Sequence, residues 1–162
     1  MKQILATLSL ILFMTGAALA QNPANPATQP TANFTIEGVI IRVISANQLV
    51  VWEADRLYPF TLYGVTLPDP DSVPGREAKK TVSELVFNKL LTVHMIEEES
   101  NPPLGLVIIR EKCLNEALVR QGVARVSTGC KAEPYCGRWR EAQTLARKNH
   151  IGIWKIPVKP SP

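Results

Sequence analysis

Histidine and cysteine are scarce in this chain, and their placement argues against the common zinc sites. Only two of the 162 residues are histidine and three are cysteine. His94 and His150 stand alone, and no two cysteines have the two-residue separation of a zinc-binding motif. The serines lack an accompanying His/Asp pattern, so a hydrolase with a serine nucleophile is not indicated. No internal repeat is visible either.

The first twenty residues have the features of an export signal. Lys2 precedes an apolar run over residues 4–17, and Ala18-Leu19-Ala20 forms a small-residue cleavage site before Gln21. The run is too short to indicate a membrane span, and no cysteine follows it for lipid attachment. We therefore expect cleavage after Ala20 and a periplasmic or secreted mature chain without a transmembrane segment. The alternative is an uncleaved N-terminal anchor.

Two further segments flank a single expected domain. Residues 21–33 read QNPANPATQPTAN, with no charge and no large apolar side chain, so they are expected to be a flexible linker. Residues 34–156 are enough for one domain with a hydrophobic core. Residues 157–162 are expected to be a disordered tail.

Charge is unevenly distributed along the chain. The formal net charge is +4. Residues 21–119 contain eight Lys/Arg and twelve Asp/Glu, a balance of −4, whereas residues 120–162 contain nine and two, a balance of +7. The basic third can attract nucleic acid, anionic lipid or an acidic protein, or can be a solvated helix face. The candidate binding residues are Arg76, Arg138, Arg140 and Arg147.

The cysteines suggest one disulfide. In an oxidising compartment, Cys130 and Cys136 are the natural pair because they close a short loop. Cys113 is then left over, buried or free, although the sequence leaves it open as a partner.

The pattern of β-rich runs and helical spacings predicts an α+β fold that is mainly β. The order is three strands, one helix, two strands and two helices, which is typical of a five-stranded OB-type barrel with helical additions. The expected strands are residues 34–43, 48–52, 57–65, 90–96 and 104–109. The expected helices are residues 77–87, the segment from residue 114, and residues 133–149 with Ala142, Leu145 and Ala146 facing inward.

The segment LNEALVRQGVARV, residues 114–126, predicts a short amphipathic helix. Asn115 is a good N-cap, and Glu116 and Arg120 have the signs that the helix dipole favours at each end. Gly122 is expected to end the helix. The inward face is expected to comprise Leu114, Ala117 and Leu118, with Gln121 as a further candidate.

This segment resembles a signature of the staphylococcal nuclease (thermonuclease-like) family. The resemblance extends over nearly all of residues 36–154, since further motifs follow the family's order. They are Tyr63-Gly64-Val65, Gly75 with Glu77-Ala78, Glu141-Ala142 with Ala146-Arg147, and Gly152-Ile153-Trp154. The resemblance implies an OB-type barrel and metal-assisted hydrolysis of phosphodiester bonds.

The same resemblance assigns the catalytic positions. Family members hold calcium with two aspartates, activate water with a glutamate, and stabilise the transition state with two arginines. Asn47 and Thr66 occupy the positions of the calcium ligands, and Thr61 and Leu104 occupy those of the arginines. Asp69 replaces the glutamate and is the one position that retains its chemistry.

Two positions that carry base-stacking aromatic residues in the family are occupied by Thr128 and Cys130 here.

We therefore expect a monomeric, exported binding module that is not an enzyme, needs no cofactor, and takes an envelope protein or nucleic acid as its partner. The alternative is a Ca²⁺-dependent endonuclease with a rebuilt site, acting on DNA or RNA.

Overall fold

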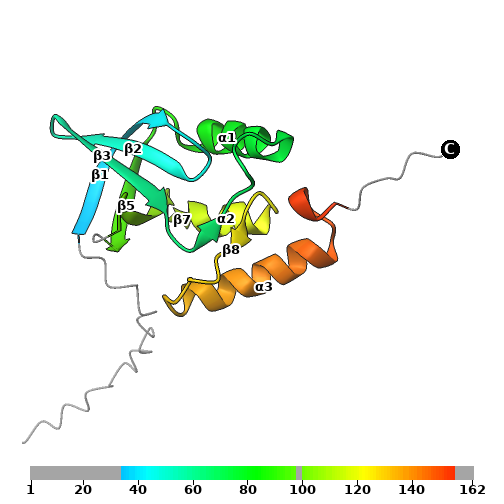
Figure 1. Cartoon of the computed structure of the whole chain (residues 1–162). Helices are drawn as coiled ribbons and strands as arrows, with labels where there is room; N and C mark the ends of the chain where they lie inside the picture. Colours follow the sequence, from blue (N-terminus) through cyan, green and yellow to red (C-terminus); the bar gives the residue numbers. More distant parts are fainter. Residues whose placement is uncertain (1–33, 98–99, 156–162) are drawn as a thin grey trace, which may run out of the picture.

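The computed structural model describes residues 34–97 and 100–155, a mainly β arrangement with three α-helices (Figure 1). The strands are β1 (Phe34–Val43), β2 (Gln48–Glu53), β3 (Arg56–Leu62), β4 (Val65–Thr66), β5 (Leu90–Glu97), β6 (Leu104–Ile109), β7 (Lys112–Cys113) and β8 (Arg125–Val126). The helices are α1 (Val73–Val86), α2 (Leu114–Arg120), α3 (Tyr135–Lys148) and the short 3₁₀ helix η1 (Gly152–Trp154). No helix in these residues is long and apolar enough to cross a bilayer. The expected signal segment, linker and tail lie outside the described residues.

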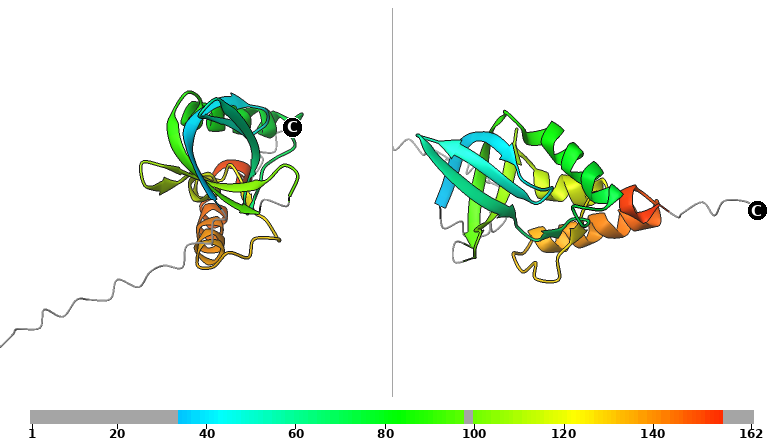
Figure 2. Two further views of the ribbon diagram at one scale, coloured as in Figure 1. Left: turned by 90° about the vertical axis from the view of Figure 1, so that its left-hand side faces the viewer. Right: turned by 45° about the horizontal axis from the view of Figure 1, so that its top comes forward.

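Five strands close into a barrel. The sheet has the order β3-β2-β1-β5-β6-β7, and a further pairing joins β3 to β6. This closing pair is parallel, with Thr61 opposite Leu104 and Leu62 opposite Gly105. Seen end-on, the strands form a ring, and α3 runs outside it on the side away from α1 (Figure 2). The predicted five-stranded OB-type barrel is therefore confirmed.

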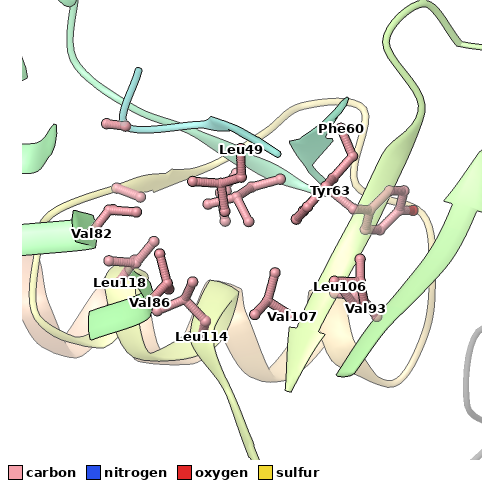
Figure 3. Packing of buried hydrophobic residues seen from close by; sticks show 14 of the residues in the cluster. Leu49, Phe60, Tyr63, Val82, Val86, Val93, Leu106, Val107, Leu114 and Leu118 are labelled. Carbon is pink, nitrogen blue, oxygen red and sulfur yellow. The ribbon is translucent and has the colours of Figure 1, made fainter. Parts of the chain in front are cut away.

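Helices α1 and α2 seal the barrel core. Val82 and Val86 of α1 and Leu114 and Leu118 of α2 point toward the strand residues of the interior, and each is at most 3% exposed (Figure 3). Burial of a side chain of this size contributes about 1.5–3 kcal/mol. The inward face predicted for the LNEALVRQG helix is thus confirmed at its two leucines.

Asn115 does not cap this helix, contrary to the sequence-based prediction. Cys113 occupies the N-cap position and Asn115 lies inside the first turn, fully buried. Its Oδ1 accepts a hydrogen bond from the Val107 amide at 3.1 Å, and its Nδ2 donates to the carbonyls of Tyr63 at 2.8 Å and Gly105 at 3.4 Å. The buried carbonyls at the β3–β6 junction bind the amide more strongly than a solvated helix end would, because an unpaired buried polar group is costly.

The predicted end of α2 at Gly122 is confirmed. Gln121 is the C-cap, and Gly122 follows with φ of +64°, a conformation that glycine adopts without strain. The amide of Val123 donates to the Leu118 carbonyl at 2.8 Å, and that of Gly122 to the Val119 carbonyl at 3.0 Å. This is the hydrogen-bond pattern of a Schellman motif.

The strand expected over residues 57–65 is two strands. β3 ends at Leu62, and Gly64 has φ of +67°, which turns the chain before β4 pairs with β8. A Cβ atom on Gly64 would lie 2.7 Å from both the Cys130 sulfur and the Trp139 ring. The turn at Gly64 that separates β3 from β4 therefore depends on contacts with Cys130 and Trp139, which are distant in sequence.

Two features of the helices differ from prediction: the first residue of α1 and the buried face of α3. α1 begins at Val73 rather than residue 77, because the Ser72 hydroxyl accepts from the Gly75 amide at 3.1 Å and Pro74 is tolerated in a first turn. In α3, Ala142 and Ala146 are buried as expected, but Leu145 is 54% exposed. Trp139 takes the inward face instead of Leu145.

Replacing Asn115 by alanine should lower the free energy of unfolding by about 2–4 kcal/mol, because it leaves the Val107 amide and the Tyr63 carbonyl buried without partners. Urea denaturation followed by circular dichroism measures the change. Asn149→Ala, at the exposed C-cap of α3, is the matched control and should cost less than about 0.5 kcal/mol. Equal costs for the two variants would show that the buried amide contributes nothing specific.

Candidate functional site

Barrel closure brings together three of the positions identified by the family resemblance. Thr61 is paired with Leu104 across the β3–β6 junction and donates its amide to the Pro103 carbonyl at 2.8 Å. Asn47 joins them because its carbonyl accepts from the Leu62 amide at 2.8 Å. All three side chains are half-buried. The Asn47 Oδ1 accepts a hydrogen bond from the Ser45 hydroxyl at 2.8 Å, so this oxygen is already engaged.

Thr66 and Asp69 lie beyond the end of β3. Thr66 is exposed in β4 and pairs with Arg125 of β8. Asp69 is exposed in the loop before α1, and its Oδ1 accepts from the Asp71 amide at 2.9 Å. Across residues 34–97 and 100–155, no three His, Cys, Asp or Glu residues are grouped closely enough to hold a metal ion.

The four candidate basic residues have different local partners. Arg76 on α1 donates to the Asp71 carbonyl. Arg140 bonds the Glu133 carboxylate at 2.9 Å and the Cys130 carbonyl at 2.8 Å. Arg138 lies over the Tyr135 ring and 3.9 Å from Glu116, while Arg147 lies 4.5 Å from the centre of the Trp154 ring. The structure brings Arg138, Arg140 and Arg147 onto one helix and leaves Arg76 on another.

Sequence reasoning did not single out Arg125, which the structure places beside Arg147. Its guanidinium lies 4.9 Å from the centre of the same Trp154 ring, an arrangement that holds both cations at one aromatic surface. Arg125 and Thr66 also line a cavity of about 310 Å³ with Leu67, Pro68, Pro74 and Ile153. The sequence signal for this pair is the Gly152-Ile153-Trp154 motif, but the separation of Trp154 from Arg125 in the chain does not indicate their contact.

The predicted disulfide between Cys130 and Cys136 is confirmed, with a Cα–Cα separation of 5.7 Å. Both residues are buried beside Trp139. The Tyr63 hydroxyl accepts from the amides of Lys131 and Ala132, at 3.2 and 3.1 Å, and so fixes the loop to the barrel. Because Cys130 is buried, it offers no surface to a nucleotide base.

A larger cavity, of about 740 Å³, is lined by Arg138 but by none of the family's catalytic positions. It is formed where β5, β6 and β7 meet α2 and the start of α3. Leu106 and Ile108 supply apolar lining, whereas Glu116 and Arg138 supply charge of both signs. The free Cys113 also lines it, and nothing in the sequence predicted that these elements would enclose a space.

Burial raises the pKa of the Cys113 thiol, and the Glu116 carboxylate adds to this because it disfavours a nearby thiolate. The backbone amides of Glu116 and Asn115 and the charge of Arg138 act in the opposite direction and are outweighed. The thiol in this cavity is therefore protonated over a wider pH range than an ordinary cysteine and is correspondingly less nucleophilic.

The profile of the family described as "Staphylococcal nuclease homologue" matches residues 62–156, more than half of the 162-residue chain. The chain belongs to the staphylococcal nuclease homologue family. The family match contains Thr66, Asp69 and Leu104, whereas β1 and β2 precede it.

One relative is an uncharacterized 38.1 kDa protein of Capnoides sempervirens. It is 31% identical over 108 residues, which cover 65% of this chain and 31% of that protein. The chain thus spans less than a third of the relative's length. The likeness to this relative is limited to those 108 residues and does not extend to the remainder of the larger protein.

Alkylation of Cys113 should begin at a higher pH in the folded chain than in the urea-unfolded chain with its disulfide intact, because the raised pKa keeps the thiol protonated. Iodoacetamide kinetics across the alkaline range measure this shift. Glu116→Gln should move the profile back toward lower pH, because it removes a repelling charge. Glu141→Gln, an exposed change on α3, should leave it in place. A profile identical to that of the unfolded chain would contradict the burial of the thiol.

Proposed function

We propose that the chain is a binding domain on the nuclease scaffold and does not hydrolyse phosphodiester bonds. The observation that carries this proposal is the barrel closure, where Asn47, Thr61 and Leu104 lie together without a formal charge among them. By the family resemblance, these are the positions of one calcium ligand and of both arginines. A guanidinium fork is the group that binds and stabilises phosphate oxygens, and neither threonine nor leucine can replace it.

The residues at these positions do not fit a calcium ion. Calcium takes about six to eight oxygen ligands and depends on carboxylates for affinity. Asn47 has its side-chain oxygen occupied by Ser45, Thr66 offers a neutral hydroxyl, and one oxygen of Asp69 accepts from the amide of its own loop. We therefore derive no step of hydrolysis through a metal at this site.

The missing groups are large contributors to catalysis in enzymes of this kind. Loss of one preorganised charge-stabilising donor raises a barrier by about 2.7–4 kcal/mol. Loss of both arginines and of the metal would remove most of the enzymatic rate enhancement, even when the effects are not additive. Rescue by Arg125 or Arg147 is not supported, because both guanidiniums are held at Trp154.

We place the domain beyond the inner membrane, with an envelope protein or nucleic acid as its partner. The disulfide is compatible with an exported protein, since such bonds persist in oxidising compartments. Two surfaces support recognition: the guanidinium of Arg147, which stacks on Trp154 but has no carboxylate partner among the described residues, and the mixed walls of the 740 Å³ cavity.

A nuclease assay tests the absence of hydrolysis. Purified chain should leave linear and single-stranded DNA and RNA intact with excess Ca²⁺ as well as with EDTA. Asn47→Asp combined with Thr66→Asp should bind Ca²⁺ more tightly than the natural chain in calorimetry, because it adds two carboxylates.

Metal-dependent cleavage that disappears with Asp69→Ala and persists with Asp71→Ala, an exposed carboxylate in the same loop, would overturn the proposal in favour of a rebuilt nuclease. Cleavage unaffected by either change would point to a contaminating enzyme.

Nucleic acid as the partner makes a separate prediction. Fluorescence anisotropy with a labelled oligonucleotide should show binding whose affinity falls steeply between about 50 and 200 mM salt. Arg147→Ala should weaken it more than Arg140→Ala, because Arg140 is already paired with Glu133. If no oligonucleotide binding is detected at the lower salt concentration, a protein partner is the remaining candidate.

A further inference from the structure

The 310 Å³ cavity combines one charged and one hydroxyl side chain with apolar walls. It is lined by Thr66 of β4, Arg125 of β8, Ile153 of η1, and Leu67, Pro68 and Pro74 of the segment that leads into α1. No acidic side chain is among these lining residues. Apolar walls with a few placed polar groups are typical of sites for small molecules, and the volume is at the lower end of the range of such sites.

The two polar side chains of the cavity project in the same direction. Thr66 and Arg125 are direct cross-strand partners in the antiparallel pair β4–β8, and such partners lie on one face of a sheet with their Cβ atoms about 4.5–5.5 Å apart. Both residues are exposed, whereas the neighbouring Val65 is buried in the core. A ligand that enters from solvent therefore reaches the hydroxyl and the guanidinium together.

The guanidinium of Arg125 is positioned by an aromatic ring but has no acceptor. Its carbon lies 4.9 Å from the centre of the Trp154 ring, and no carboxylate or carbonyl among residues 34–97 and 100–155 accepts from its N–H groups. Arg147, 4.5 Å from the same ring centre, likewise has no acid partner in that part of the chain. Two cations at one indole repel each other, so a bound anion is favoured there.

Backbone contacts hold the walls of the cavity in place. The Ile153 amide donates to the Gly122 carbonyl at 2.9 Å, and Gly152 lies so close to that oxygen that a Cβ atom would overlap it. This close approach fixes η1 against the residues that follow α2. In the same way, Gly75 of α1 packs directly on the Asp69 carbonyl, which holds the loop after β4 against the first turn of α1. Walls that are ordered in advance reduce the entropic cost of binding a ligand.

We propose that this cavity binds a small organic carboxylate with a short apolar body. The carboxylate accepts two parallel hydrogen bonds from the guanidinium fork of Arg125 and one from the Thr66 hydroxyl. The apolar body packs on the leucine, isoleucine and proline walls. Arg147 adds a second positive charge at Trp154 without lining the cavity itself.

The composition of the walls favours this class of ligand over others. Inorganic phosphate would leave the apolar walls without a partner, and a neutral molecule would leave the Arg125 guanidinium unpaired. A cation would be repelled by Arg125 and Arg147. The proposal does not depend on the proposed function, because of the five catalytic positions assigned by the family resemblance only Thr66 lines this cavity. Its hydroxyl is present whether or not the chain cleaves nucleic acid.

Titration of the ¹⁵N-labelled full chain with 4-methylpentanoate, followed by NMR, tests the site without nucleic acid or metal. Binding should saturate with a Kd below about 1 mM and shift the indole N–H signal of Trp154, but not those of Trp52 and Trp139. Acetate, 4-methylpentanamide and inorganic phosphate should each bind at least about tenfold more weakly, because each lacks the apolar body or the carboxylate. No saturation up to about 10 mM, or an amide or phosphate that binds as tightly as the acid, would overturn the proposal.

Substitutions locate the carboxylate. Arg125→Gln should weaken the binding of 4-methylpentanoate by at least about tenfold, and Thr66→Val, which removes only the hydroxyl, by about three- to tenfold. Arg125→Lys keeps the charge but loses the fork, so it should fall between the natural chain and Arg125→Gln. Arg56→Gln, at an exposed arginine of β3 without an ion pair among the described residues, should leave the affinity unchanged.

Thermal unfolding confirms that each variant is folded. Affinity that survives Arg125→Gln in a folded chain, or that falls equally with Arg56→Gln, would overturn the assignment of the site.

Discussion

Three hydrogen bonds from one buried side-chain amide join α2 to the place where the barrel closes. Asn115 accepts a hydrogen bond from the Val107 amide and donates to the carbonyls of Tyr63, directly after β3, and Gly105, near the start of β6. A parallel contact of only two residue pairs would be a weak closure by itself. Because the polar groups involved are buried, each is costly to leave unpaired, and the amide satisfies them together.

The same closure determines the environment of the family's catalytic positions. It sets Asn47, Thr61 and Leu104 side by side whatever their chemistry, since their backbones form the junction. A scaffold that is specified by a buried amide and an apolar core can therefore persist while exposed and half-buried residues at the junction change. Membership of the nuclease family and the chemistry of this site are separate properties, and the second rests on side chains that the fold does not require.

Much of the fold was predictable because it depends on local periodicity. The bounds of β1 and β6 agree with the sequence pattern, and Gly122 ends α2 as expected. The errors lie where a distant contact overrides a local preference. Asn115 is a residue type that commonly caps helices, but its side chain bonds to the barrel. Leu145 has the spacing of an inward-facing residue, but it faces solvent because Trp139 fills the inner face of α3. Among the candidate site residues, the sequence supplied the positions at the junction but not the pairing of Arg125 and Arg147 at Trp154.

The sequence by itself determined the barrel, the disulfide and the family, since hydrophobic spacing, paired cysteines and ordered motifs are all properties of residue type and separation. Only the tertiary structure decided which polar groups are buried together, which charges find partners, and which apolar side chains of β1, β2, β3 and β5 remain on the surface. The physical reason is that burial and charge pairing depend on contacts between segments far apart in the chain. Cross-strand register sets Leu57, Trp52, Val39 and Leu90 opposite one another on four strands, and no single strand contains that information.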